Sequence, residues 1–255
     1  MGRILSIHSY RGGTGKSNVT ANLAWLLARR GKRVAVLDTD LQSPGVHMVL
    51  GLDRERLTFT LTDFLFGNCE IEEAAYDLTR DLEVEGEGAL FLLPSRMTVE
   101  AISRVIAQGY DAGRLGDHFD DLIAALGLDV LLLDTHPGLN RETMLSTSVS
   151  DLLLILLRPD VQDFHGTAVI LKVAQALNVG RTLMLANKVS QSTALGSLRD
   201  SIQSTFGADL VGLLPLSDEM ATLGSRGLFA RRFPGHPISV ELESVTTRLL
   251  AELER

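Results

Sequence analysis

A glycine-rich segment near the amino terminus contains the residue types that bind phosphate. An apolar run at 4–7 predicts a buried strand, a loop with three glycines follows, and Lys16 and Ser17 open a segment with helical apolar periodicity. Glycines let backbone N–H groups close around phosphate oxygens, and the start of a helix adds its positive dipole end. The Lys16 ammonium can reach β- and γ-phosphates, and the Ser17 hydroxyl suits a Mg²⁺ ligand. We therefore predict a phosphate-binding loop at 11–17.

This loop departs from the strict pattern G-x-x-x-x-G-K-[ST] at one position. Tyr10 stands where the pattern has its first glycine, and Arg11 adds a second cation at the mouth of the loop. The alternative is a turn that serves packing alone, with Lys16 as a solvated helix start. Phosphate binding is favoured because strand, loop, Lys-Ser pair and helix occur in the order that the motif requires.

A second chemical signal is Asp134, which ends the apolar run at 130–133. The run predicts a buried strand, and ligands bind along the carboxyl edge of open α/β sheets. An aspartate there can hold Mg²⁺ through its waters, and Gly138 could supply a backbone N–H that senses a γ-phosphate. The alternative is that Asp134 only caps a turn, which the phosphate-binding loop upstream makes less favoured.

Asp38 and Asp40 follow another apolar run at 34–37 and form a third signal. Asp38 is placed to support the metal. Asp40, on the loop, is the better candidate for orienting an attacking water. His47 and His136 lie near these motifs, but a lone loop histidine is more often solvated than catalytic, and we assign them no role.

Composition narrows the class of protein. The chain has 255 residues, 45% of them hydrophobic, with a net charge of −8 and a single cysteine, Cys69. This length fits one domain spanning 1–255. Cys69 alone forms neither an internal disulfide nor a multi-cysteine metal site, and the sequence shows no membrane-spanning run or signal segment. We therefore expect a cytoplasmic protein whose surface as a whole does not bind nucleic acid.

Apolar runs and helical patterns alternate along the chain, which predicts an α/β fold: a doubly wound, mostly parallel central sheet flanked by helices. The predicted strands are 4–7, 34–37, 89–93, 130–133, 152–157, 182–186 and 210–214. The predicted helices include 16–30, 58–66, 70–77, 97–108, 116–126 and 237–254.

These motifs together resemble the MinD/ParA family of deviant Walker A P-loop ATPases (SIMIBI class), nearer the MinD branch. The family's loop usually reads Lys-Gly-Gly-x-Gly-Lys-Thr, which 11–17 matches with Arg11 in place of the signature lysine. The first switch is matched by 38–41 and the second by 134–139. Two weaker matches are Ala186-Asn187-Lys188, similar to the adenine-reading turn, and Leu214-Pro215-Leu216, similar to a base-flanking segment.

The resemblance implies a Mg²⁺-dependent ATPase that forms a homodimer on binding ATP and separates after hydrolysis, slow alone and stimulated by a partner protein. Such switches position a cellular cargo or a division or surface component. Carried over by position, Arg11, Lys16 and Asp40 are catalytic, and Ser17, Asp38 and Asp134 are the metal site. The implied nucleotide-binding residues are Arg11, Gly12, Gly13, Thr14, Gly15, Lys16, Ser17, Asn18, Asn187 and Pro215, with Asp40 and Gly138 in the switches.

Arg11 is the departure with the largest consequence. Arginine keeps the positive charge and offers a bidentate fork to phosphate oxygens, but its shape and reach differ from those of lysine. It could preserve hydrolysis from across the dimer or hold a long-lived ATP dimer; a solvated loop charge is the alternative. Asn18 and His136 also differ from the commonest family residues.

Partner surfaces are less defined. Membrane-binding relatives end in a basic amphipathic helix, whereas the segment 239–255 is amphipathic but acidic and is expected to pack its apolar side on the domain. A membrane-binding carboxyl-terminal helix is therefore not expected. Arg226, Arg231 and Arg232 form a candidate nucleic-acid patch, for which a solvated surface cluster is the favoured alternative.

Other functions remain open. One is an ATP-binding scaffold with little turnover. Another is an ATP-dependent amide ligase or other biosynthetic enzyme on the related fold, which would need a further small-molecule site that the sequence does not show. An iron–sulfur carrier is disfavoured because Cys69 is the only cysteine.

Overall fold

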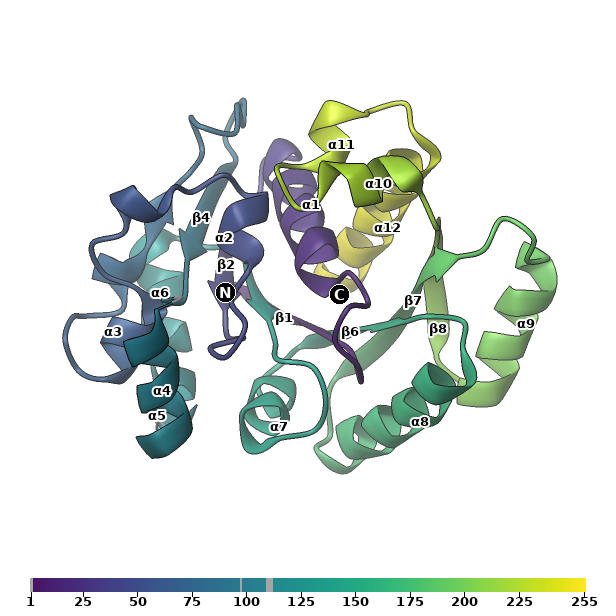
Figure 1. Ribbon diagram of the computed structural model, residues 1–255, viewed down its shortest axis with the longest axis horizontal. Coiled ribbons are helices and arrows are strands. Elements are labelled where there is room, and N and C mark those ends of the chain that lie inside the picture. Colours follow the sequence, from purple (N-terminus) through teal and green to yellow (C-terminus); the bar gives the residue numbers. More distant parts are fainter. Residues whose placement is uncertain (1, 97, 109–111) are drawn as a thin grey trace.

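One twisted sheet forms the centre of the molecule. In the computed structural model, residues 2–96, 98–108 and 112–255 are described, and within them eight strands lie in the order β3-β4-β2-β5-β1-β6-β7-β8 (Figure 1). The strands are β1 (Arg3–His8), β2 (Arg33–Asp38), β3 (Tyr76–Asp77), β4 (Ala89–Leu93), β5 (Val130–Asp134), β6 (Leu152–Leu157), β7 (Arg181–Val189) and β8 (Asp209–Pro215). All neighbouring pairs are parallel except β3 with β4. The predicted α/β class is confirmed.

Helices cover both faces of this sheet (Figure 1). They are α1 (Lys16–Arg29), α2 (Val46–Val49), α3 (Leu61–Leu65), α4 (Val99–Gln108), α5 (Ala112–Asp117), α6 (Phe119–Leu126), α7 (Arg141–Ser148), α8 (Val161–Ala176), α9 (Leu195–Phe206), α10 (Asp218–Leu223), α11 (Phe229–Arg232) and α12 (Pro237–Leu253), with 3₁₀ turns at Arg54–Arg56 and Glu72–Ala74. The α1, α11 and α12 helices pack on one face, and α6, α8 and α9 on the other.

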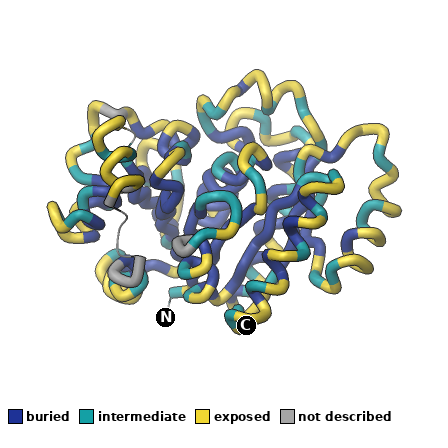
Figure 2. The backbone as a smooth tube through the Cα atoms, turned by 60° about the horizontal axis from the view of Figure 1, so that its bottom comes forward, coloured by how far each residue is buried: buried dark blue, intermediate teal, exposed yellow. Residues whose placement is uncertain are grey.

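The two covered faces explain why the strands read as continuous apolar runs. In β5, Val130 and Leu132 enter the core on the α1 side, whereas Leu131 and Leu133 enter the core on the α6 side. Successive side chains of a strand point to opposite faces, so both sets must be apolar. Figure 2 shows the resulting buried centre, with most of the exposed residues on the outer helices and loops.

Strand order brings the chemical motifs together. The β5 strand lies between β2 and β1, and its register sets Asp134 opposite both Asp38 and Ile7. The loop at 9–15 leaves the end of β1 and leads directly into α1. Parallel strands expose their carboxyl ends at one edge, so this loop and both aspartates share that edge.

Several predicted elements differ from the observed ones. The segment 70–77 was predicted helical but forms a 3₁₀ turn and the edge strand β3, whose Tyr76 hydroxyl accepts a hydrogen bond from Thr58 N and donates to Phe59 O. The helix predicted at 58–66 is only α3, which begins at a Thr60–Asp63 capping box. The helix predicted at 116–126 is split at His118 into α5 and α6. Residue 97, in the predicted helix 97–108, lies outside the described residues.

The acidic carboxyl-terminal helix packs as predicted. Ile238, Leu242, Val245 and Leu249 of α12 are buried in the core beside α1 and β8. Within the described residues, no helix combines the length and apolar character needed to cross a membrane.

A glycine sets how closely β4 approaches α1. A Cβ atom on Gly88 would lie 1.9 Å from the carbonyl oxygen of Ala28, and neither backbone can move without disturbing the sheet or the helix. We predict that Gly88→Ala lowers the free energy of unfolding by about 2–3 kcal/mol, measured by chemical denaturation. The control is Gly196→Ala in α9, where no atom lies within 4 Å of the added Cβ and alanine favours the helix by up to ~1 kcal/mol. Equal effects of the two substitutions would contradict this account.

Candidate functional site

The loop between β1 and α1 has the backbone that its glycines allow. Gly13 and Gly15 adopt φ values of +77° and +92°, which L side chains rarely adopt, and a Cβ on Gly15 would lie 2.5 Å from Asn187 Nδ2. Asn187 Nδ2 donates to the Thr14 carbonyl at 2.7 Å, and Lys188 Nζ donates to the Gly13 carbonyl at 2.7 Å. Because the N–H and C=O of a trans peptide point in opposite directions, these bonds turn the following amide N–H groups away from β7.

Two adjoining cavities open beside this loop. The first, of about 330 Å³, is lined by every predicted loop residue from Arg11 to Asn18 and by Asp40 and His136. The second, of about 270 Å³, is lined by Asn187 and Pro215 and by the apolar side chains of Leu214, Met220, Ile238 and Leu242. Gly15, Asn18 and Ser225 line both. The pair therefore combines a loop built for phosphates with a neighbouring, more apolar space.

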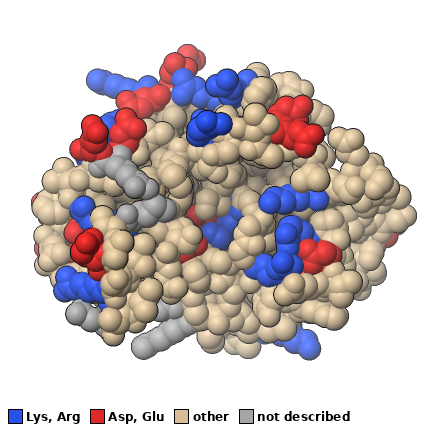
Figure 3. Space-filling view, viewed as in Figure 1, with Lys and Arg blue, Asp and Glu red and all other residues tan. Residues whose placement is uncertain are grey.

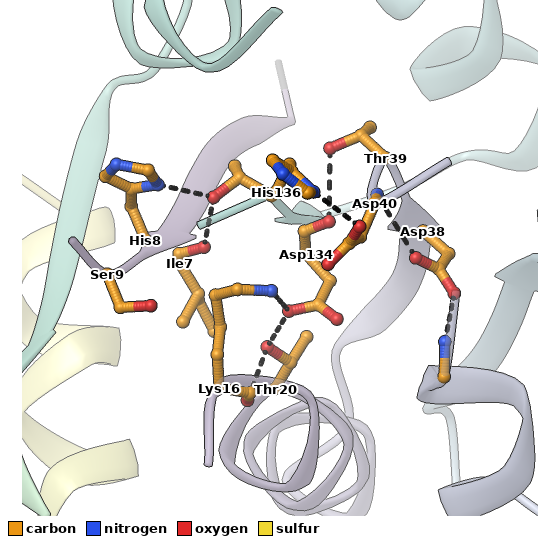
Figure 4. Close-up of polar contacts among 12 residues, drawn as sticks. Ile7, His8, Ser9, Lys16, Thr20, Asp38, Thr39, Asp40, Asp134 and His136 are labelled. Atoms are coloured by element: carbon orange, nitrogen blue, oxygen red, sulfur yellow. Dashed lines mark hydrogen bonds and ion pairs between the residues drawn. The ribbon is translucent and has the colours of Figure 1, made fainter. Parts of the chain in front are cut away.

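Lys16 forms a buried ion pair beneath the loop. Its Nζ donates to Asp134 Oδ1 at 2.9 Å, and the Thr20 hydroxyl donates to the same oxygen at 2.9 Å (Figure 4). Lys16 is 6% exposed and Asp134 is fully buried, so each charge requires the other. Sequence reasoning placed both residues but missed their pairing and missed Thr20, which lies one helical turn from Lys16.

Asp38 lies beside Asp134 in the interior. Its carboxylate accepts the Asp40 N–H at 3.3 Å and the Gly45 N–H at 3.1 Å. Burial, and secondly the neighbouring Asp134 carboxylate, raise the pKa of Asp38 well above its ordinary value. Two adjacent buried carboxylates thus create a demand for positive charge at this edge of the sheet.

The donor set fits a hydrated Mg²⁺ ion. Asp134 Oδ2 is buried without a hydrogen-bond partner, and Ser17 lines the first cavity. Within the described part of the chain, no group of three or more His, Cys, Asp or Glu side chains forms a metal cage. Mg²⁺ usually keeps several waters and takes few protein ligands, which matches Ser17, Asp38 and Asp134 as its surroundings.

Asp40 contacts a histidine that sequence reasoning left without a role. His136 Nδ1 lies 2.7 Å from Asp40 Oδ1, and Ser43 N donates to the same oxygen at 3.1 Å. The general tendency of loop histidines to be solvated does not hold for these two: the His136 side chain is only a quarter exposed, and His47 is buried. The spacing of 96 residues between Asp40 and His136 gives no local signal, so only the strand order reveals the pair.

Arg11 turns toward the start of α8. Its NH1 lies 3.6 Å from Asp160 Oδ1 and 3.6 Å from Asp163 Oδ1, an ion pair longer than a hydrogen bond. Arg158 pairs with the same two carboxylates. Arg11 is therefore ion-paired within the protein while a third of its side chain remains exposed. Sequence reasoning missed Asp160 and Asp163, although their position directly after β6, the neighbour of β1, was a usable signal.

The segment that follows β5, expected to be the second switch, is tied to the base of the loop. His8 Nδ1 bonds the Thr135 hydroxyl at 2.7 Å, Thr135 Oγ1 donates to Ile7 O at 3.0 Å, and Gly138 N donates to Ser9 O at 3.0 Å. The Gly138 N–H, expected to sense a phosphate, is thus bonded to the loop's first residue. Because the Thr135 hydroxyl proton is used, His8 Nδ1 is the donor in its bond. Burial, and secondly Lys16, lower the pKa of His8 to about 3.

The candidate nucleic-acid patch is largely paired within the protein. Arg226 donates to the carbonyls of Leu223 and Thr222, and Arg231 pairs with Glu83 at 2.8 Å. Figure 3 shows basic and acidic side chains interspersed over the face that contains the site, with both charges at the bottom of a central hollow. Basic side chains gather to the right of the hollow with an acidic one beside them, and among the described residues they form no stripe across the whole face.

Known proteins share this sequence pattern and fold. A family model described as "CobQ/CobB/MinD/ParA nucleotide binding domain" matches residues 5–229. An uncharacterized ATP-binding protein of Methanocaldococcus jannaschii is 26% identical over 248 residues, which cover 96% of this chain and 87% of that protein.

Solved structures show the same architecture. The MinD cell division protein of Aquifex aeolicus matches with a TM-score of 0.82 at 21% identity, covering 98% of this chain and 97% of that one. The septum site-determining protein MinD of Pyrococcus horikoshii, complexed with Mg-ADP, matches with a TM-score of 0.81 at 22% identity, covering 100% and 99%. At these identities, the likeness shows the fold.

The neutral state of His8 predicts a pH dependence of stability. The folded-state pKa of about 3 lies below the ordinary 6.5, so the unfolded chain takes up a proton first as the pH falls. Stability contributed by His8 is complete above pH 6.5 and is lost between pH 6.5 and 3, at up to ~1.4 kcal/mol per pH unit. We expect denaturation at pH 7, 6 and 5 to show a shallower decline for His8→Asn, whose amide can still donate to Thr135. The same slope in both proteins would refute a buried, neutral His8.

Proposed function

The chain belongs to the CobQ/CobB/MinD/ParA family of P-loop nucleotide-binding proteins, as its motifs predicted, and on that basis we propose that it is a Mg²⁺-dependent ATPase acting as an ATP-gated homodimerising switch. The observation that carries the proposal is one edge of the sheet where the glycine loop, Lys16, Asp134, Asp38 and Asp40 meet.

The two adjoining cavities suit the two ends of ATP. Phosphates fit the loop cavity, where Lys16, Ser17 and the loop amides gather. The adenine fits the second cavity, between Asn187 and Pro215. Asn187 donates one amide hydrogen to the Thr14 carbonyl. The same side chain would therefore contact the base and hold the loop in shape.

The buried ion pair allows Lys16 to exchange its partner, from the Asp134 carboxylate to phosphate oxygens. Phosphate oxygens compete with Asp134 for the Lys16 ammonium, and a Lys16 that turns to the β- and γ-phosphates leaves the Asp134 carboxylate in need of another cation. Ser17, Asp38 and Asp134 would hold Mg²⁺, which neutralises phosphate charge when bound. Asp40, beside the same cavity, would orient the attacking water.

Arg11 is the residue proposed to act between protomers. Its side chain is one-third exposed and is held by Asp160 and Asp163 at 3.6 Å rather than by short hydrogen bonds. Such a contact is weak enough to exchange for phosphate oxygens of a second copy, to which a guanidinium can bind through two N–H groups. ATP binding would thereby favour the dimer, and hydrolysis would release it.

The cellular role follows from the kind of protein that the chain resembles. The structural neighbours include proteins titled as cell division and septum site-determining MinD. We extend the proposal to spatial positioning of a cargo or of a division or surface component, with slow hydrolysis that a partner protein stimulates.

We predict that two substitutions affect different steps, one ATP binding and the other ATP hydrolysis. Lys16→Gln removes the phosphate-binding ammonium and should weaken ATP binding roughly 10- to 100-fold, by isothermal titration with Mg²⁺ present. Asp40→Ala should bind ATP as wild type does, but its rate of phosphate release should fall by ~10²-fold or more, because only the water is misplaced. Lys172→Ala, on the exposed side of α8, is the charge-matched control for Lys16→Gln and should change neither quantity.

Three outcomes would contradict this assignment. Undiminished ATP binding by Lys16→Gln would exclude the loop as the phosphate site. Full hydrolysis by Asp40→Ala, or wild-type hydrolysis that is unaffected by EDTA, would exclude the proposed ATPase chemistry.

A further inference from the structure

The carboxylate assigned to the attacking water is held by one of its two oxygens. Asp40 Oδ1 accepts from His136 Nδ1 at 2.7 Å and from Ser43 N at 3.1 Å. Asp40 Oδ2 has no hydrogen-bond partner within 2–96, 98–108 and 112–255. The side chain is 10% exposed and lines the loop cavity, so a solvent molecule can reach this second oxygen. The two donors to Oδ1 thus fix the orientation of the carboxylate and leave Oδ2 available to a water in the cavity.

The backbone alone does not set this orientation. Asp38 Oδ1 accepts the Asp40 N–H at 3.3 Å, which anchors the main chain of Asp40 to the end of β2. The side-chain torsions are then fixed by the bonds on Oδ1, of which the bond from His136 is the shorter. A hydrogen bond to a carboxylate is stronger than one between neutral groups, and 2.7 Å is typical of it.

His136 is itself held on both sides. The preceding Thr135 is bonded to His8 and to the Ile7 carbonyl, and the following Gly138 donates to Ser9 O. Pro137 further restricts the backbone of His136. The imidazole therefore projects from a segment that is fixed to β1 (Figure 4). A shift of either switch would move the donor away from its acceptor.

We propose that His136 is a positioning residue for ATP hydrolysis: its Nδ1–H bridges the two switches and orients Asp40 so that Oδ2 faces the attacking water. The inference rests on the proposed function and adds a residue to it. Because orientation of a catalytic group acts on the transition state, losing the bridge slows turnover without weakening ATP binding. Asparagine at 136 carries an N–H donor at a comparable distance along the side chain and preserves the bridge.

The first test compares steady-state ATP hydrolysis by wild type, His136→Ala and His136→Asn. We expect His136→Ala to lower kcat at least ~10-fold with the KM for ATP within about twofold of wild type. His136→Asn should recover most of kcat. Adding His136→Ala to Asp40→Ala should cause little further loss, because both substitutions remove the same function. His236→Asn, which keeps a capping side chain at the start of α12, is the matched control.

The second test needs no turnover. The chain has six histidines, so nitrogen–proton correlation spectra can resolve their rings. At pH 8 without nucleotide, His136 should be the Nδ1–H tautomer in wild type and should shift toward Nε2–H in Asp40→Ala, because the bond at Nδ1 sets the tautomer. A tautomer unchanged by Asp40→Ala would overturn the bridge.

The kinetic outcomes distinguish the positioning role of His136 from the ATPase function on which it rests. An unchanged kcat in His136→Ala, equal losses in the alanine and asparagine variants, or a loss confined to KM would overturn the positioning role while leaving the ATPase assignment intact. Absence of hydrolysis by wild type would overturn the proposed function, and the inference with it.

Discussion

Two carboxylates buried side by side at the end of the sheet are the constraint on which the site depends. The register of β2 on β5 sets Asp38 opposite Asp134, with both fully buried, and desolvated like charges are costly. The Lys16 ammonium offsets one of them by bonding Asp134. In the proposed function, a bound cation satisfies the remaining demand for positive charge when Lys16 turns from Asp134 to the phosphates. The two buried carboxylates thus have only one lysine to compensate them, which favours the binding of a further cation.

Around this centre, tertiary contacts hold the segments that follow the strands in defined positions. Arg11 lies against the acidic start of α8, Gly138 is bonded to Ser9, and His136 is bonded to Asp40. Each contact joins a segment at the end of one strand to a segment at the end of a neighbouring strand. In the proposed switch, a nucleotide that moves one segment breaks or reforms its bonds to the next, and the change reaches the protein surface at Arg11. Of these contacts, the ion pair of Arg11 is the most exposed and hence the easiest to exchange.

The sequence was sufficient for residues whose roles follow from local backbone chemistry. Gly13 and Gly15 require positive φ, Lys16 opens α1, and Asp38 and Asp134 end buried strands, so motif order and apolar runs predicted their common edge. Pairings set by tertiary structure could not be read in the same way. Asp40 and His136 are 96 residues apart, and Lys16 and Asp134 are 118 residues apart. The helix predicted at 70–77 was wrong for the same reason, because β3 is a strand only through its pairing with β4.

In the proposed switch, ATP joins two copies of the chain through Arg11. The most direct test is the solution mass by size-exclusion chromatography with light scattering, for wild type and Arg11→Ala, with ADP or a non-hydrolysable ATP analogue and Mg²⁺. We expect a monomer of 27.7 kDa in every case except wild type with the ATP analogue, which should have twice that mass. A mass that depends on neither nucleotide nor Arg11 would contradict the switch and leave a nucleotide-binding protein that works without dimerising.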